Sequence, residues 1–294
     1  MTTQTAPWRE PVSTYNYRLV NVFAESVLAG NPLCVFEDAR GLDDATMQAL
    51  ALQFNLSETT FVLPSSAATA RVRIFTPAFE MPFAGHPTLG TAHIVRALKG
   101  ADPLTLEMRA GVIPVRGAGD RWTLQTNAPR TRPVSASRQD LAAMLGLEAS
   151  DIGSPPLWVD TGSEQLVIPV ASVAAVRRAQ PKADLMSRHA TVALAGAASR
   201  SMAYLWTEVA PNGALARFFF LKQGSVVEDP GTGSACANLG GWFVTTGAPL
   251  PIELTIAQGE AVGRRCRLGL NVDAEKRIFV SGRVIEIGRG TIEL

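Results

Sequence analysis

Glu58, His86 and Asp229 have side chains that could carry out acid–base chemistry in this sequence. A carboxyl group in apolar surroundings has its pKa raised toward neutrality and can then move protons, whereas an exposed one is only a solvated charge. Glu58 lies between a predicted helix end and a predicted apolar strand, where both interpretations are open. His86 could act as a general acid or hydrogen-bond donor, or could cap a helix.

Two glycine-rich turns, at 81–87 and 228–234, contain most of the other candidates. A glycine turn lets the backbone approach a ligand, and the first N–H groups of a helix lack partners inside the helix. Asp229 in the second turn suits an Asx turn, but also the orientation of His86 or the binding of a substrate ammonium group. Ser234 is either a helix cap or a donor to a carboxylate. Two such turns predict a small anion held between two helix N-termini.

The elements that must position these residues recur in the same order in both halves. We expect strands at 17–23, 59–64, 70–77, 104–108 and 119–125, with helices at 43–54 and after the first turn. A Pro-, Arg- and Ser-rich stretch at 128–135 is the predicted linker. A helix at 139–145 follows, then strands at 157–161, 165–169, 202–206 and 216–221, the second turn with its helix, and strands at 252–256, 266–272 and 278–282. The repeat predicts a duplicated α+β unit, and the hairpin-like pairs argue against a doubly wound parallel sheet.

Composition excludes several classes of protein. The chain has 294 residues, 47% of them hydrophobic, and a prior of roughly 150 residues per domain favours two domains. A net charge of +1 with 7% aromatic residues predicts no nucleic-acid partner. The sequence has no apolar run of the roughly 20 residues that span a bilayer, and residues 1–13 are expected to be a polar tail without signal-peptide order. Three widely spaced cysteines predict reduced thiols and a cytoplasmic location.

The spacing of motifs predicts neither a metal nor a nucleotide cofactor. His86 and His93 are seven residues apart, which is not a metal-ligand spacing, and no acidic or cysteine cluster joins them. The Gly231-Thr232-Gly233 segment lacks the GxGxxG pattern, and neither a phosphate-binding GxxxxGK[ST] sequence nor a GxSxG elbow occurs.

Four ordered motifs resemble the phenazine-biosynthesis (PhzF-like) isomerase family. They are AGNPL at 29–33, NLSETTFV at 55–62, FAGHPTLG at 83–90 and EDPGTGSA at 228–235, and a late QG…GR segment at 258–264 adds to them. The resemblance runs from about Tyr17 to the C-terminus.

The resemblance implies the diaminopimelate epimerase-like α+β fold, with two similar domains, each a curled, mostly antiparallel sheet around a central helix. We expect an N-terminal domain at 14–129, a C-terminal domain at 130–283, and a last strand at 284–294 that returns to the first domain. The family also implies an active site between the domains, catalysis without cofactor or metal, and a homodimer.

The family's site residues fall on matching positions here. The proton shuttle maps to Glu58, and the other predicted catalytic residues are His86 and Asp229. The predicted substrate-binding residues are Asn31, Ser57, Gly85, Gly231, Thr232, Gly233, Ser234 and Ala235. For Asn31 a structural role is the alternative.

Two positions depart from the wider superfamily, whose epimerases and proline racemases carry a cysteine just before the glycine of each turn. Here these positions hold Ala84 and Pro230, and Gly231 stands where many family members have a side chain such as valine. We therefore predict a cofactor-independent isomerase that uses Glu58 to move a proton on a small, cyclic or unsaturated carboxylate. The alternatives are an epimerase with Glu58 and His86 on opposite faces, and a non-catalytic carboxylate-binding protein.

Overall fold

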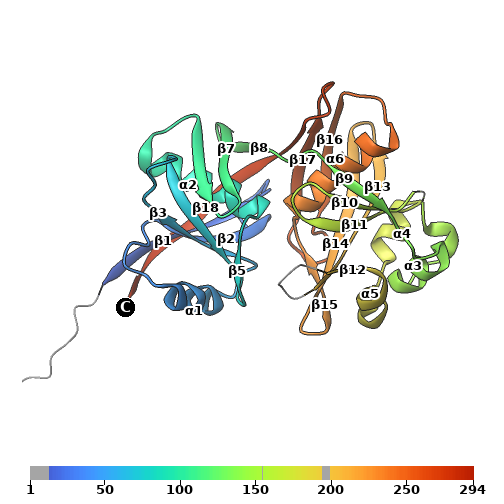
Figure 1. Ribbon diagram of the computed structural model, residues 1–294, viewed down its shortest axis with the longest axis horizontal. Coiled ribbons are helices and arrows are strands. Elements are labelled where there is room, and N and C mark those ends of the chain that lie inside the picture. The colour runs from blue at the N-terminus through green and yellow to red at the C-terminus, as the bar shows by residue number, and fades with distance from the viewer. Residues whose placement is uncertain (1–12, 154, 194–198) are drawn as a thin grey trace, which may run out of the picture.

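The computed structural model describes residues 13–153, 155–193 and 199–294. The first half contains, in chain order, β1 (Thr14–Val22), β2 (Asn31–Phe36), α1 (Asp44–Phe54), β3 (Thr59–Leu63), β4 (Ala70–Phe75), β5 (Glu80–Met81), α2 (Gly85–Lys99), β6 (Leu104–Met108), β7 (Gly111–Ala118) and β8 (Arg121–Gln125). The second half contains β9 (Arg130–Pro133), α3 (Arg138–Leu145), the 3-10 turn η1 (Ala149–Asp151), β10 (Leu157–Asp160), β11 (Glu164–Pro169), α4 (Val173–Arg178), α5 (Ala183–His189), β12 (Thr191–Val192), β13 (Arg200–Ala210), β14 (Gly213–Lys222), β15 (Ser225–Asp229), α6 (Gly233–Thr246), β16 (Ile252–Gln258) and β17 (Cys266–Val272). The last strand, β18 (Ile278–Glu293), runs along both halves (Figure 1).

The strands of the first half form a closed ring around α2. Its order is β18, β1, β2, β3, β4, β6, β7 and β8, and β8 pairs again with β18. In the second half β9, β10, β11, β13, β14, β16, β17 and β18 follow one another around α6. The parallel pairs are β2–β3 and β4–β6 in the first half and β11–β13 and β14–β16 in the second, at matching places in the two orders. This shared pattern confirms the predicted duplication of an α+β unit.

Strand β18 connects the two halves through its pairing. Its first residues pair with β17 and β8, whereas Val284–Glu293 pair with β1. The domain boundaries at 129 and 283 stay a prediction. Residues 1–12 of the expected tail lie outside the described residues, but Ser13 exchanges backbone hydrogen bonds with Leu294, so the tail does not extend to position 13.

The predicted linker at 128–135 is wrong in part, because β9 lies within it and pairs with β10. The Arg132 guanidinium lies 4.4 Å from the ring centre of Trp158 and binds Glu164 at 2.7 Å. These cross-strand contacts stabilise a strand whose local composition is typical of a loop. Strand β7 was not predicted either, since its glycines and proline weaken the strand signal.

Small residues allow the two central helices to lie close to their sheets. A Cβ on Gly90 in α2 would come within 2.6 Å of Leu33 Cδ2, and one on Gly240 in α6 would come within 2.8 Å of Ile278 Cγ2. Helix α2 contacts every strand of its ring. Within the described ranges, no helix is both long and apolar enough to cross a bilayer.

We expect Gly90→Val and Gly240→Val each to lower the free energy of unfolding by at least the 1–3 kcal/mol typical of overpacked cores. The added side chain would push the helix away from strands that have no space to yield. Urea unfolding followed by circular dichroism measures the effect. Gly288→Val is the matched control, because a Cβ on Gly288 in β18 meets nothing within 4 Å. Equal stability of the three variants would contradict this account of the packing.

Candidate active site

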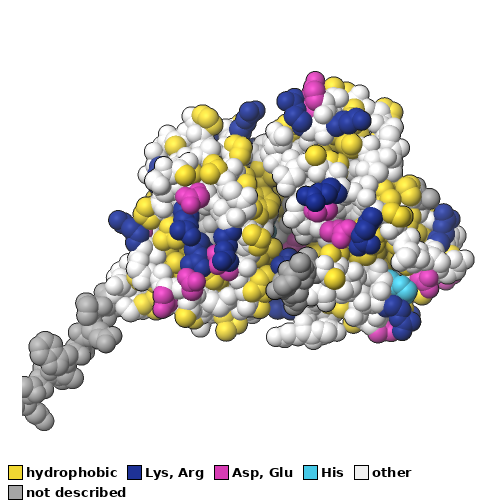
Figure 2. Space-filling view, viewed as in Figure 1, with side chains coloured by type: hydrophobic (Ala, Val, Ile, Leu, Met, Phe, Trp, Pro, Cys, Tyr) yellow, Lys and Arg dark blue, Asp and Glu magenta, His cyan; other side chains and the backbone are white. Residues whose placement is uncertain are grey.

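The helices α2 and α6 begin against one another, where the two halves meet along the furrow visible in Figure 2. A Cβ on Gly85 would lie 3.4 Å from Gly233 Cα, so the two backbones are nearly in contact. The N-cap residues are Ala84 and Thr232, and neither side chain caps its helix. Unsatisfied N–H groups and two positive helix ends therefore face the same small region, which suits an anion.

Glu58 and His86 meet beside these helix ends. Glu58 immediately precedes β3, and His86 lies in the first turn of α2. Glu58 Oε2 is 3.6 Å from His86 Nε2, and the side chains are 15% and 6% exposed. Both atoms are buried and have no hydrogen-bond partner among the residues described. Buried polar atoms without partners are uncommon, and they often mark a site where a ligand completes the bonding.

Burial sets the protonation of this pair. It raises the pKa of Glu58 to about 8, with a further increase from the negative charge of Asp229 and a decrease from Arg200. Burial also lowers the pKa of His86 to about 3, against a smaller opposing effect of a hydrogen bond with the Pro32 backbone. Between these values both groups are neutral. The contact is therefore not a salt bridge at neutral pH, although its length is within ion-pair range.

Asp229 ends β15 and is held by residues from both halves. Asn31 Nδ2 donates to Asp229 Oδ1 at 3.0 Å and to the Gly231 carbonyl at 3.0 Å, and it lies 3.5 Å from His86 Nδ1. The Thr232 hydroxyl also donates to the Asp229 carboxylate. Burial raises the pKa of Asp229, and these hydrogen bonds oppose that increase. The Asn31 amide thus connects the two glycine-rich turns.

Ser234 is not the helix cap, and its hydroxyl instead belongs to a polar chain in the second half. Gln165 Nε2 donates to Ser234 Oγ at 2.9 Å, and Asn238 Nδ2 donates to Gln165 Oε1 at 2.9 Å. Asn238 Oδ1 in turn accepts from the hydroxyl of Thr161 at 2.7 Å. A chain of satisfied hydrogen bonds fixes the orientation of the Ser234 side chain.

The other predicted substrate-binding residues differ in their surroundings. The Thr232 hydroxyl accepts from Gln258 Nε2 at 3.0 Å, whereas Ser57 is exposed and makes no side-chain hydrogen bond within the described part of the chain. Ala235 is fully buried, and its methyl side chain has no polar group that could bind a ligand. Gly231 is packed so tightly that a Cβ there would lie 2.7 Å from Cys266 Sγ. The turn is therefore closely packed at the position where many family members carry a side chain.

Three residues near the site were not predicted as functional: Gln165, Gln258 and Arg200. Gln165 follows Glu164 at the beginning of β11, before the apolar residues of the strand, and nothing in its local sequence points to a site. Gln258 falls in the late QG…GR segment and donates to the Asp229 carbonyl at 2.9 Å. Arg200 follows a run of small residues, and nothing in its local sequence points to a site.

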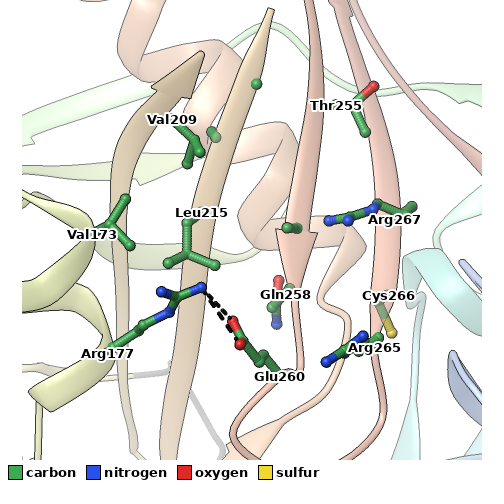
Figure 3. Close-up of a pocket in the computed structure, with 13 residues that line it drawn as sticks. Val173, Arg177, Val209, Leu215, Thr255, Gln258, Glu260, Arg265, Cys266 and Arg267 are labelled. Atoms are coloured by element: carbon green, nitrogen blue, oxygen red, sulfur yellow. Dashed lines mark hydrogen bonds and ion pairs between the residues drawn. The ribbon is translucent and has the colours of Figure 1, made fainter.

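A groove of about 500 Å³ lies on the second half, away from Glu58 and His86. Val173, Leu215 and Arg177 line it, and Arg177 pairs with Glu260 across it (Figure 3). Only its edge near Gln258 and Cys266 adjoins the Asp229 turn. The groove is thus separate from the cluster around Glu58.

Cys34, Cys236 and Cys266 are free and buried, and burial raises the pKa of all three thiols. These thiols are therefore protonated at neutral pH and poor nucleophiles. Within the described residues, no group of three or more His, Cys, Asp or Glu side chains is arranged to hold a metal ion.

Comparison with known proteins identifies the family. Residues 20–290 match the family described as phenazine biosynthesis-like protein (PhzC-PhzF). The chain belongs to this family. It is 40% identical over 286 residues to an uncharacterized isomerase of Pasteurella multocida, covering 96% of this chain and 95% of that one. It is 34% identical over 292 residues to the trans-2,3-dihydro-3-hydroxyanthranilate isomerase of Pseudomonas chlororaphis, covering 95% of this chain and 100% of the relative.

A solved structure supports the fold. The Bacillus anthracis phenazine biosynthesis protein of the PhzF family superposes with a TM-score of 0.82 at 24% identity, covering 95% of this chain and 99% of that one. The predicted α+β fold, with two similar halves each curled around a central helix, is confirmed. The protein is accordingly an enzyme of the PhzF-like isomerase family.

We expect Glu58→Gln to stabilise the protein at pH 8 and to have little effect at pH 4.5. The fold favours the protonated form of Glu58, so wild-type stability falls as the pH rises from the ordinary value of 4.5 through about 8. The change is at most about 5 kcal/mol, at 1.36 kcal/mol per pKa unit. Urea unfolding between pH 4.5 and 8.5 measures it, with Glu253→Gln at an exposed position of β16 as the control. The same pH dependence in Glu58→Gln as in the wild type would contradict the burial effect.

Proposed function

We propose that this enzyme is a cofactor-independent isomerase that moves a proton on a small, cyclic or unsaturated carboxylate, with Glu58 as both base and acid. The observation that carries this proposal is the buried Glu58–His86 pair beside two abutting helix N-termini. A carboxylate bound by the N–H groups of Gly85 and Gly233 would lie next to Glu58. Such a substrate would supply the anion that this region favours.

In the proposed reaction the ionised Glu58 accepts a proton from a substrate carbon, and the electron pair of the C–H bond moves into the adjacent π-system. Glu58 then returns the same proton to another carbon of that system, so the double bond shifts and no atom is gained or lost. The helix N-termini stabilise negative charge that spreads onto the carboxylate. His86 orients Glu58 by direct contact, and Asp229 acts through its charge and through Asn31, which it shares with His86.

The named relative supports the substrate class. Trans-2,3-dihydro-3-hydroxyanthranilate, named for the Pseudomonas chlororaphis enzyme, is a cyclic, unsaturated carboxylate. At 34% identity we carry over this chemical class and not the particular compound. The homodimer and the cytoplasmic location stay predictions from the sequence.

Geometry argues against the two alternatives. An epimerase with bases on opposite faces needs the reacting carbon between them, and hence about 6 Å between base atoms, twice the hydrogen-bond reach. The Glu58 and His86 atoms are 3.6 Å apart, which leaves no space for a carbon. A protein that only binds a carboxylate has no use for a buried carboxyl group with a pKa of about 8, whereas the transfer of a proton near neutral pH requires such a group.

Glu58→Gln should abolish proton exchange at a substrate carbon. A positioned acid–base group contributes about 10²–10⁴-fold, and glutamine can neither accept nor return a proton. The assay is proton NMR in D2O with a panel of small unsaturated carboxylates that includes trans-2,3-dihydro-3-hydroxyanthranilate. Glu253→Gln is again the control. Exchange at the wild-type rate in Glu58→Gln would refute the role of Glu58, inversion at a stereocentre would favour the epimerase, and no exchange by the wild type would favour a binding protein.

The pH profile of kcat/KM should rise tenfold per pH unit below about 8 and level off above it. Only ionised Glu58 can accept the first proton, and its pKa is about 8. Asp229→Asn should move the rise to lower pH, because removing a neighbouring negative charge favours ionisation of Glu58. Steady-state kinetics from pH 5.5 to 9.5 measure both. A wild-type rate that falls with pH across 6–8 would show that the reaction begins from protonated Glu58 instead.

A further inference from the structure

Arg200 is a partly buried cation beside the site, and the proposed mechanism gives it no role. It is the first residue of β13, which runs parallel to β11 with Leu166 paired to Ala203. Gln165, next to Leu166, binds the Ser234 hydroxyl at the start of α6. The register therefore places the beginning of β13 at the same end of the sheet as the α6 N-terminus.

The guanidinium of Arg200 also contacts the first half of the chain. Its Cζ lies over the ring of Phe79, 5.1 Å from the ring centre, and Phe79 is in the loop before β5. A cation–π contact fixes the plane of the guanidinium but leaves its N–H donors available in that plane. The side chain is thus oriented across the boundary between the two halves.

Several other partly buried arginines have carboxylate partners, and the partly buried Arg264 donates instead to the Gly30 carbonyl at 2.8 Å and to Asn21 Oδ1 at 2.7 Å. Within the described ranges the Arg200 guanidinium has neither a carboxylate partner nor a hydrogen-bond acceptor. The paired examples are Arg18 with Glu286 at 2.9 Å, Arg73 with Glu80 at 2.8 Å and Arg217 with Glu228 at 2.7 Å. Glu80, next to Phe79, is occupied by Arg73 and by Arg109 at 3.0 Å. The segment 194–198 that precedes Arg200 contains no acidic residue. A partly buried charge normally has a counter-charge. An anion from outside the chain would supply the counter-charge that Arg200 lacks.

Glu58 does not fill this role. The charges of Glu58 and Arg200 act on each other, since Arg200 lowers the pKa of Glu58 and Glu58 raises that of Arg200. No ion pair or hydrogen bond joins the two side chains, although both are among the described residues. The groups are close enough to interact electrostatically and too far apart to touch.

We infer that Arg200 binds a second acidic group of the substrate, so that this enzyme acts on a dicarboxylate. The inference rests on the proposed function: one carboxylate lies at the α2 and α6 N-termini, the reacting carbon beside Glu58, and the other carboxylate on Arg200. The planar guanidinium matches a carboxylate with two parallel N–H···O bonds. The Phe79 ring would pack against the hydrocarbon part of the substrate next to that group.

The test compares binding of monocarboxylate and dicarboxylate probes to the full chain. Benzoate is the monocarboxylate, and phthalate, isophthalate and terephthalate carry the second group at three different spacings. Titrations monitored by amide NMR and calorimetry give the affinities for wild type, Arg200→Gln and Arg200→Lys. Arg188→Gln, which removes an exposed cation on α5, is the matched control for net charge.

We expect at least one dicarboxylate to bind the wild type about 10- to 100-fold more tightly than benzoate, the range of a charge-assisted hydrogen bond. Arg200→Gln should lose this preference and keep its affinity for benzoate, Arg200→Lys should keep part of it, and Arg188→Gln should keep all of it. An equal preference in wild type and Arg200→Gln would overturn the inference, even if the pKa of Glu58 changed.

Failure of this inference can be separated from failure of the proposed function. If benzoate shifts the Gly85 and Gly233 amide signals but no dicarboxylate binds more tightly, the role of Arg200 is wrong and the carboxylate site between the helices remains. If no probe shifts these signals, the helix N-termini do not hold a carboxylate, and both proposals fail.

Discussion

The near contact of the Gly85 and Gly233 backbones is the constraint on which the site depends. Each helix lies inside a curled sheet, and the contact requires both helices to begin at the boundary between the two halves. Phe23, in a left-handed conformation at φ 60°, packs against Gly233 and Gly282, where a Cβ would come within 3.3 and 2.3 Å of its ring. A Cβ on Gly282 would displace the Phe23 ring, which packs against Gly233 at the start of α6. The region that we propose for an anion is therefore a consequence of how closely the repeated units pack.

The same packing explains the unusual protonation at the site. Water is largely excluded from Glu58 and His86, so each takes its neutral form over much of the pH range. Three buried polar atoms, Glu58 Oε2, His86 Nε2 and Asn31 Oδ1, have no hydrogen-bond partner among the described residues. Elsewhere a buried carboxylate such as Glu228 is paired with Arg217. The cluster at the helix ends thus lowers the stability of the free enzyme, as is common where a substrate supplies the missing partners.

Local signals account for what the sequence could predict. Glycine turns, proline-terminated strands and motif order identify the duplicated fold, and they place Glu58, His86, Asp229 and Asn31 together. Strand β9 and the pairing of Arg200 with Phe79 depend on contacts between distant segments, and these leave no periodic pattern in either segment. Ser57, by contrast, was predicted to bind substrate, and the structure leaves its side chain without a hydrogen bond in the described part of the chain. Ser57 lies next to Glu58 in the same motif, but its side chain is exposed in the bend between α1 and β3.

Ala84 and Pro230, at the two positions where the resemblance to epimerases predicts cysteine, fit a reaction with a single base. Ala84 caps α2 with its backbone, since its carbonyl accepts from both the N–H and the hydroxyl of Thr88, at 3.2 and 2.6 Å. Pro230 has no N–H and leads directly from Asp229 into Gly231. Neither side chain can carry a proton, so the residues that can are Glu58, His86 and Asp229, linked through Asn31. With the acid–base groups gathered in one cluster, removal and return of the proton on the same face of the substrate is the simplest course, and this favours isomerisation over inversion.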